Sequence, residues 1–322
     1  MLSKLSTLPR AHGVGGQVVC TITTLTPAHR ASSSPSHARR LLGRIRRQIT
    51  HRGGDAVTIP GDGGIDMPPP PPACPDGWRT GSPDFVGVGV QRCGTTRWFD
   101  LLSSHPEIDR PVGAKELHYF DQFHTGPFGP TDIERYHRYF PREGGHQVGE
   151  WTPLYMSAPW VPPLLARSAP NARLLVLLRD PVERYLSGLQ LDTRVAARRG
   201  APLSRYAPLE AFMRGFYHRQ LLGLLAHFER SRILVLQYER CTGEPQSQLR
   251  RTFEFLGLND TAFVPDISAH PKHQPEKPAL DPDIRTAYTQ AYRDDVLSLV
   301  ELFPEIDLEL WPNFSDLGAG PA

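Results

Sequence analysis

The chain has 322 residues, of which 39% are hydrophobic, and this is enough for one large α/β domain or two small ones. The net charge is +2, and no stretch approaches the roughly 18 uncharged apolar residues of a membrane-spanning helix, so stable membrane insertion is not expected. The four cysteines are scattered and form no C-x-x-C pair, which argues against a disulfide framework or a metal site and predicts a reducing, cytoplasmic setting.

The first 80 residues are predicted to be a disordered tail. They are rich in Ser, Arg, Gly and Pro, end near the run Pro68–Pro72, and offer little apolar surface to offset the entropy of ordering. Residues 1–53 hold nine Lys or Arg and no Asp or Glu, leaving 27 basic against 34 acidic residues in 54–322. Such a start also resembles an organellar transit peptide, so import is an alternative, as is a translation start placed too far upstream. The folded domain is predicted over 81–315.

An anion cradle is predicted where the globular pattern begins. Residues 85–90 are expected to form a buried strand and 95–104 a helix, with Gly94 in the turn between them. The first N–H groups of a helix have no internal partner and the helix dipole favours negative charge there, so this turn suits a phosphate or sulfate. An ordinary βα turn is the alternative.

The remaining elements predict a parallel sheet with helices on both faces. The apolar run 173–178 is typical of a central strand, 232–238 of a third strand, and a helix over about 246–256 is expected to end at Gly257. Late apolar residues from Tyr288 to Phe303 recur at helical spacing. Strands that alternate with helices indicate a doubly wound α/β fold, whose ligands bind beyond the C-terminal ends of the strands.

A second anion site is predicted directly after the central strand. Arg179 ends that strand, and Ser187 follows eight residues later in a helix opened by Asp180 and Pro181. A guanidinium fork plus a hydroxyl suits a phosphate monoester. A structural ion pair between Arg179 and Asp180 is the alternative.

Together these two motifs resemble those of the sulfotransferases that use 3′-phosphoadenosine 5′-phosphosulfate (PAPS). The segment 91–96, Gln-Arg-Cys-Gly-Thr-Thr, resembles the family's 5′-phosphosulfate loop, and 179–187 resembles its 3′-phosphate motif. They lie about 85 residues apart, each after a predicted strand. The resemblance implies the P-loop-like sulfotransferase fold, with PAPS as co-substrate, 3′-phosphoadenosine 5′-phosphate (PAP) as product and no metal.

Three further segments resemble the heparan-sulfate and related carbohydrate sulfotransferases and their bacterial relatives. Residues 115–121, Lys-Glu-Leu-His-Tyr-Phe-Asp, are similar to a K-E-x-H-F-F-D segment of that branch, and 149–155 and 253–258 to two others. The resemblance covers about residues 83–312. It implies a saccharide or another small hydroxylated acceptor.

The resemblance also implies roles for single residues. Glu116 would be the general base, with His118 beside it, and Arg92 would serve both binding and catalysis. The cofactor-binding residues would be Arg92, Cys93, Gly94, Thr95 and Thr96 at the 5′ end, Arg179 and Ser187 at the 3′ end, and Lys272 in a loop over the nucleotide. Burial among apolar neighbours is expected to raise the pKa of Glu116. A surface ion pair with Lys115 is the alternative, disfavoured if the segment is a strand, because adjacent residues then face opposite sides.

Two positions depart from the family pattern. Relatives carry lysine where this chain has Arg92, and arginine keeps the charge but is bulkier and does not readily give up a proton. Relatives often carry lysine where this chain has Trp151, and a tryptophan there suggests stacking on a sugar face.

Three other functions fit parts of the pattern. A P-loop kinase or NTPase shares the phosphate cradle but needs a G-x-x-x-x-G-K-[ST] loop, whose Lys-Ser/Thr ending is missing here. A non-catalytic PAP-binding protein would bind the nucleotide without transfer. A nucleic-acid role for the basic tail is disfavoured, because residues 1–53 contain no aromatic residue for stacking on bases.

Overall fold

The computed structural model describes residues 68–111, 114–259, 263–269 and 279–318. Most of the predicted tail, residues 1–67, lies outside this described part, and so does Lys272. Within residues 68–80, the hydroxyl of Tyr139 donates to the carbonyl of Pro69, and Arg79 forms an antiparallel bridge with Arg142. The residues just before the domain thus contact it.

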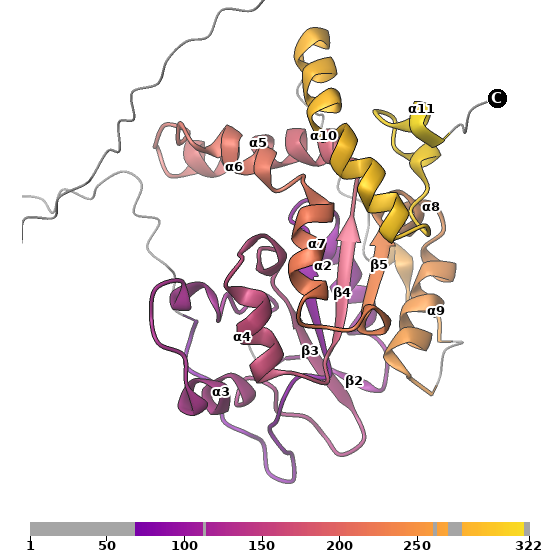
Figure 1. Ribbon diagram of the computed structural model, residues 1–322. Helices are drawn as coiled ribbons and strands as arrows, with labels where there is room; N and C mark the ends of the chain where they lie inside the picture. The colour runs from indigo at the N-terminus through magenta and orange to yellow at the C-terminus, as the bar shows by residue number, and fades with distance from the viewer. Residues whose placement is uncertain (1–67, 112–113, 260–262, 270–278, 319–322) are drawn as a thin grey trace, which may run out of the picture. The chain divides into compact units, whose positions relative to one another are not determined.

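A five-stranded parallel sheet forms the centre, in the order β2-β3-β1-β4-β5 (Figure 1). The strands are β1 (Phe85–Gly89), β2 (Ile108–Asp109), β3 (Gln147–Trp151), β4 (Arg173–Leu178) and β5 (Ile233–Gln237). Every residue of β1 and β5 is buried, and so are all residues of β4 after its first. Strands covered on both faces read as continuous apolar runs, and for this reason β1, β4 and β5 were predictable from sequence.

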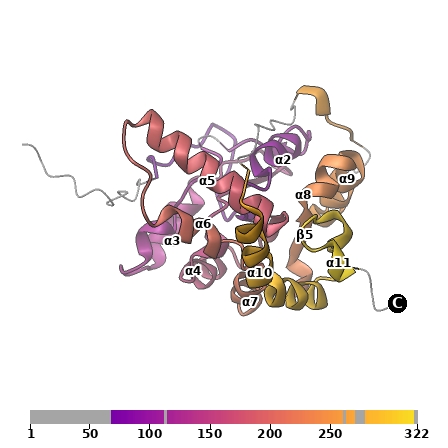
Figure 2. The same cartoon turned by 90° about the horizontal axis from the view of Figure 1, so that it is seen from above.

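Helices cover both faces of this sheet (Figures 1 and 2). Helices α2 (Thr95–Leu102) and α9 (Pro245–Leu256) lie on one side, and α4 (Val161–Ser168), α7 (Tyr217–Leu225) and α10 (Pro282–Leu302) on the other. The remaining helices are α3 (Pro130–His137), α5 (Pro181–Arg198), α6 (Ala207–Met213), α8 (Tyr238–Gly243) and α11 (Ser315–Gly318). The predicted doubly wound α/β fold is confirmed. None of the described helices is long and apolar enough to cross a bilayer.

Local signals set several helix ends. The Asp180 carboxylate accepts hydrogen bonds from the backbone N–H groups of Val182 and Glu183, at 2.9 and 3.1 Å, so α5 begins with the predicted cap. Helix α9 ends at Gly257, whose φ of 68° is left-handed, as predicted.

The core between β1 and β3 corrects the prediction for Trp151. Its side chain is 0% exposed, and its indole N–H donates to the carbonyl of Gly89 at 3.1 Å. The ring packs so closely on Gly87 that a Cβ there would lie 2.0 Å from it. Trp151 fills the core and cannot stack on a sugar, so this sequence-based interpretation was wrong.

Candidate active site

The loop between β1 and α2 and the first turn of α2 carry five of the predicted residues, Arg92 to Thr96. Gly94 caps α2 with φ 84° and leaves room for Tyr238, whose ring would lie 3.0 Å from a Cβ at this position. Thr95 is buried and Thr96 exposed at the first turn of α2. Cys93 is fully buried, which raises the pKa of its thiol to about 12 and fits a packing role.

Arg92 points to the second motif. Its Nε donates to the hydroxyl of Ser187 at 3.0 Å, and its own carbonyl accepts a hydrogen bond from Arg179 at 3.3 Å. Burial lowers the pKa of Arg92, and the positive charges of Arg179 and Arg194 lower it further. Residues from the β1–α2 loop, the end of β4 and α5 thus meet in one cationic cluster.

Arg179 is held by neighbours of its own. Its guanidinium stacks over the Tyr238 ring at 4.6 Å, and its backbone carbonyl accepts from the Tyr217 hydroxyl at 2.8 Å. Asp180 serves the α5 cap and accepts two hydrogen bonds from Asn313 instead. Within the described part of the chain Asp180 is therefore not the ion partner of Arg179, and the alternative structural pair is not found.

The segment with Glu116 and His118 is irregular rather than a strand. Hydrogen bonds hold it to Trp151 of β3 and to Thr152, the next residue. The N–H of Trp151 donates to the carbonyl of Lys115 at 2.9 Å. The hydroxyl of Thr152 accepts from the N–H groups of Leu117 and His118, at 3.0 and 3.3 Å.

A buried carboxylate lies beneath this segment. Glu150 is 0% exposed and accepts hydrogen bonds from the hydroxyls of Tyr136, Tyr155 and Thr152 and from the N–H of Leu117. Burial raises the pKa of Glu150, and these hydrogen bonds oppose the rise. A buried carboxylate surrounded by donors fixes the path of the segment that carries Glu116.

Lys115 reaches the anion loop, which corrects a prediction made from sequence. Its Nζ lies 2.9 Å from Glu116 Oε1, and 3.4 and 3.2 Å from the hydroxyl oxygens of Thr95 and Thr96. Lys115 and Glu116 are therefore paired, because the irregular backbone does not alternate its side chains as a strand would. This pair lies at the loop, so it is compatible with a role for Glu116 in the site.

The charge state of Glu116 also differs from expectation. Partial burial acts to raise its pKa, but the hydrogen bond from His118 and the Lys115 ammonium outweigh this effect, so the pKa lies below the ordinary value. The predicted rise toward neutrality is wrong for the protein without substrate. His118 lies 2.8 Å from Asp121 and 3.5 Å from Glu116, and these two carboxylates raise its pKa to about 10.

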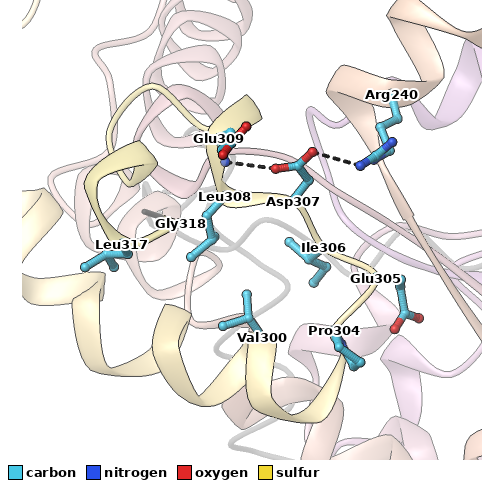
Figure 3. A pocket seen from close by; sticks show the side chains of 10 residues that line it. All are labelled: Arg240, Val300, Pro304, Glu305, Ile306, Asp307, Leu308, Glu309, Leu317 and Gly318. Atoms are coloured by element: carbon cyan, nitrogen blue, oxygen red, sulfur yellow. Dashed lines mark hydrogen bonds and ion pairs between the residues drawn. The ribbon is translucent and has the colours of Figure 1, made fainter. Parts of the chain in front are cut away.

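Other cavities lie apart from these residues. A pocket of about 370 Å³ near the C-terminal end of α10 is lined in part by Arg240, Asp307 and Glu309 (Figure 3). Arg240 and Asp307 form an ion pair there at 2.8 Å, so these two charges neutralise each other. Among the described residues we find no group of three or more His, Cys, Asp or Glu that could hold a metal ion.

Comparison with known proteins agrees with this geometry. The sequence model of the family described as "Sulfotransferase domain" matches residues 82–272. The chain belongs to this family. The fold and the family were thus correctly predicted from sequence, and membership decides against the P-loop kinase alternative.

The sequence identity to individual relatives is low, at about one third or less. The chain is 30% identical over 190 residues to heparan sulfate glucosamine 3-O-sulfotransferase 3B1 of Mus musculus. This alignment covers 55% of this chain and 46% of that protein. It is 33% identical over 129 residues to the membrane-associated sulfotransferase kil1 of Dictyostelium discoideum, 39% and 26% of the two proteins. The chain thus spans less than half the length of these curated relatives. A crystal structure of a sulfotransferase from Alicyclobacillus acidocaldarius superposes with a TM-score of 0.57 at 27% identity, covering 71% of this chain and 98% of that one.

Sequence reasoning missed several residues that the site brings together. Arg194 adds positive charge beside Arg92, and Tyr238 supports both Arg179 and Gly94. Tyr238 directly follows β5, so the rule that ligands bind beyond strand ends was a usable signal. Glu150 lies in the segment 149–155 that resembles the family, but its partners Tyr136 and Tyr155 come from separate elements, so the sequence pattern did not predict its buried hydrogen bonds.

Proposed function

We propose that this chain transfers a sulfuryl group from PAPS to a hydroxyl group of a carbohydrate or another small hydroxylated acceptor, releasing PAP. The observation that carries the proposal is the meeting of two cationic groups at one edge of the sheet. Arg92, Arg179 and Ser187 contact one another beside the loop after β1, and Lys115, paired with Glu116, contacts the first turn of α2.

The residues present fit such a nucleotide. Arg179 and Ser187 suit the 3′-phosphate, and an anion bound beside Arg92 and Arg179 would relieve the repulsion between these two like charges. The backbone N–H groups of Gly94–Thr96 at the start of α2 and the two threonine hydroxyls suit the 5′-phosphosulfate. Both anionic ends of the ligand would thus find donors.

In this proposal Glu116 acts as the general base. As the acceptor oxygen bonds to sulfur, its proton passes to the Glu116 carboxylate, and the S–O bond to the 5′-phosphate breaks with its electron pair leaving on that oxygen. The lowered pKa of Glu116 keeps the carboxylate ionised at neutral pH, and His118 and Lys115 hold it in place. Positioning and electrostatic stabilisation would supply most of the remaining acceleration.

The acceptor is proposed as a class of molecules, whereas the donor is one compound, PAPS. Relatives named heparan sulfate glucosamine 3-O-sulfotransferases support a sugar hydroxyl. The buried Trp151 offers no contact to a sugar, so the acceptor must be held by other residues. We propose a cytoplasmic location on the basis of the scattered cysteines, with organellar import through the N-terminal segment as the alternative.

Incubation of the purified full chain with ³⁵S-labelled PAPS and a panel of heparan sulfate, simple glycosides and phenols tests the proposal. We expect label in at least one acceptor and release of PAP. Tight PAP binding with no transfer to any acceptor would favour a non-catalytic binding protein. Absence of PAP binding in calorimetry would overturn the proposal entirely.

A further inference from the structure

A cavity of about 560 Å³ lies at the edge of the sheet where the parallel strands begin. We call it the distal cavity, and its lining includes Ser82, Asp84, Arg167, Asn171, Arg173 and Arg232. Arg173 is the first residue of β4, and Arg232 directly precedes β5. Arg179 follows the other end of β4, six positions from Arg173, so about 20 Å of strand separates the distal cavity from the two phosphate motifs.

Positive charge dominates the lining of the distal cavity. Arg167, Arg173 and Arg232 line it, and Asp84 is the single carboxylate among the described lining residues. Asp84 is already neutralised, because it forms an ion pair with Arg142, which is not part of the lining. Within the part of the chain that the structure describes, none of the three lining arginines forms an ion pair. The distal cavity therefore holds three cations without a compensating anion.

Each of these arginines also makes a structural contact. Arg173 donates to the carbonyl of Leu256, the last residue of α9, and Arg232 donates to the carbonyl of Asn171 at 2.7 Å. Arg167 contacts another backbone carbonyl at 3.1 Å. A cation offsets the partial negative charge of a helix C-terminus, but a guanidinium carries five N–H donors. These contacts explain where the arginines lie and leave most of their donors available for a ligand.

The distal cavity can be reached from solvent and suits an oxyanion. Arg167 is exposed, while Arg173 and Arg232 are half-buried. The volume is in the range of small-molecule sites. The planar guanidinium fork matches the oxygens of a sulfate or phosphate group, to which it can donate two parallel hydrogen bonds. Ser82 and Asn171 also line the cavity, so the hydroxyl groups of a sugar would find polar neighbours.

We propose that the distal cavity is a separate anion-binding site, which takes a sulfate or phosphate group, either free or carried by a saccharide. Arg167, Arg173 and Arg232 supply the donors and the positive charge. Because the length of β4 separates this site from the nucleotide site, it binds its ligand while PAP is bound. Its existence does not depend on the proposed function.

Calorimetry on the full chain saturated with PAP tests the inference, because PAP keeps the probes out of the nucleotide site. The probes are inorganic sulfate, inorganic phosphate, a sulfated disaccharide and the same disaccharide without sulfate, at an ionic strength held constant with chloride. We expect the anionic probes to bind and the desulfated disaccharide not to bind. Arg167→Gln and Arg232→Gln should each weaken the anionic probes by about 5- to 30-fold, through the loss of a charge-assisted hydrogen bond. Arg232→Lys should restore part of the affinity.

Arg219→Gln is the matched control, because it removes the same charge from an exposed position of α7 outside the distal cavity. It should leave every affinity within about twofold, since exposed charges at a distance are screened. Thermal unfolding of each variant shows whether it folds.

Four results would overturn the inference: unchanged binding in both cavity variants, an equal loss in Arg219→Gln, loss of all anion binding when PAP is present, or equal binding of the desulfated disaccharide. Tighter binding of the sulfated disaccharide than of inorganic sulfate would support a group carried by a saccharide, and the reverse order would support the free ion. If the wild-type chain binds no PAP, the proposed function fails, and the same variants still test the distal cavity without PAP.

Discussion

The Nε atom of Arg92 lies 3.0 Å from the hydroxyl oxygen of Ser187, and this hydrogen bond joins the loop after β1 to helix α5. The two residues are 95 positions apart in sequence, yet their hydrogen bond brings the two motifs into contact. A single ligand with a phosphate at this point would contact both.

Ser187→Ala should therefore weaken PAP more than adenosine 5′-monophosphate. The hydroxyl orients Arg92 and can donate to a 3′-phosphate, and its loss should lower PAP affinity by about tenfold or more. Calorimetry measures both ligands, with the exposed Ser231→Ala as control. Equal affinity of wild type and Ser187→Ala for PAP would contradict the assignment of the 3′-phosphate to this side.

Replacing His118 by asparagine should shift the pH dependence of transfer. His118 lowers the pKa of Glu116, so its removal raises that pKa, and the acid limb of kcat/KM should move to higher pH. In the wild type, activity that depends on the His118 imidazolium should fall as the pH rises through about 10. Initial rates between pH 4 and about 10.5 test both limbs. An unchanged acid limb in the variant would mean that His118 does not act on the base.

Glu150→Gln should destabilise the fold and loosen the segment above it. Glutamine replaces one acceptor oxygen with an N–H₂ group, which then faces hydroxyl and backbone donors in a fully buried site. The loss should be about 1–3 kcal/mol in urea unfolding. Glu143→Gln, on an exposed side chain, should change the free energy of unfolding by less than about 0.5 kcal/mol. Similar values for both variants would contradict the role of Glu150.

Gly87→Ala should be strongly destabilising. The added Cβ would lie 2.0 Å from the Trp151 ring, and neither the central strand nor the buried indole has room to move. We expect a loss of about 1–3 kcal/mol or more, measured by thermal or urea unfolding. Gly144→Ala, with no atom within 4 Å of its Cβ, serves as control. A stable Gly87→Ala variant would mean that Trp151 can move, and would reopen a contact with the acceptor.

Sequence predicted those parts of the fold that depend on local pattern. Strand β4 was predicted at its observed bounds, because both of its faces are covered and its residues are apolar almost throughout. Strand β3 was missed, since Gly149 and Glu150 interrupt any such run. Glu150 is tolerated there only through hydroxyls of Tyr136 and Tyr155, which reach it from separate elements.

The motifs of the site were predictable from sequence, but the contacts between individual side chains were not. The motifs around Arg92 and Arg179 follow strands, so parallel topology brought them together as expected. The partners of Lys115 depend on an irregular segment whose path is fixed by β3 and Thr152, and no periodicity reports such a path. Trp151 was misassigned for a similar reason, because its packing against Gly87 is a contact between strands.

The most direct test of the account compares Glu116→Gln with the wild type in two measurements on the same preparation, PAP affinity and the rate of ³⁵S transfer at saturating PAPS. If Glu116 is the general base, transfer should fall by about 10²–10⁴-fold while the dissociation constant of PAP changes by less than about threefold. Transfer at the wild-type rate, with PAP bound equally well, would contradict the central claim.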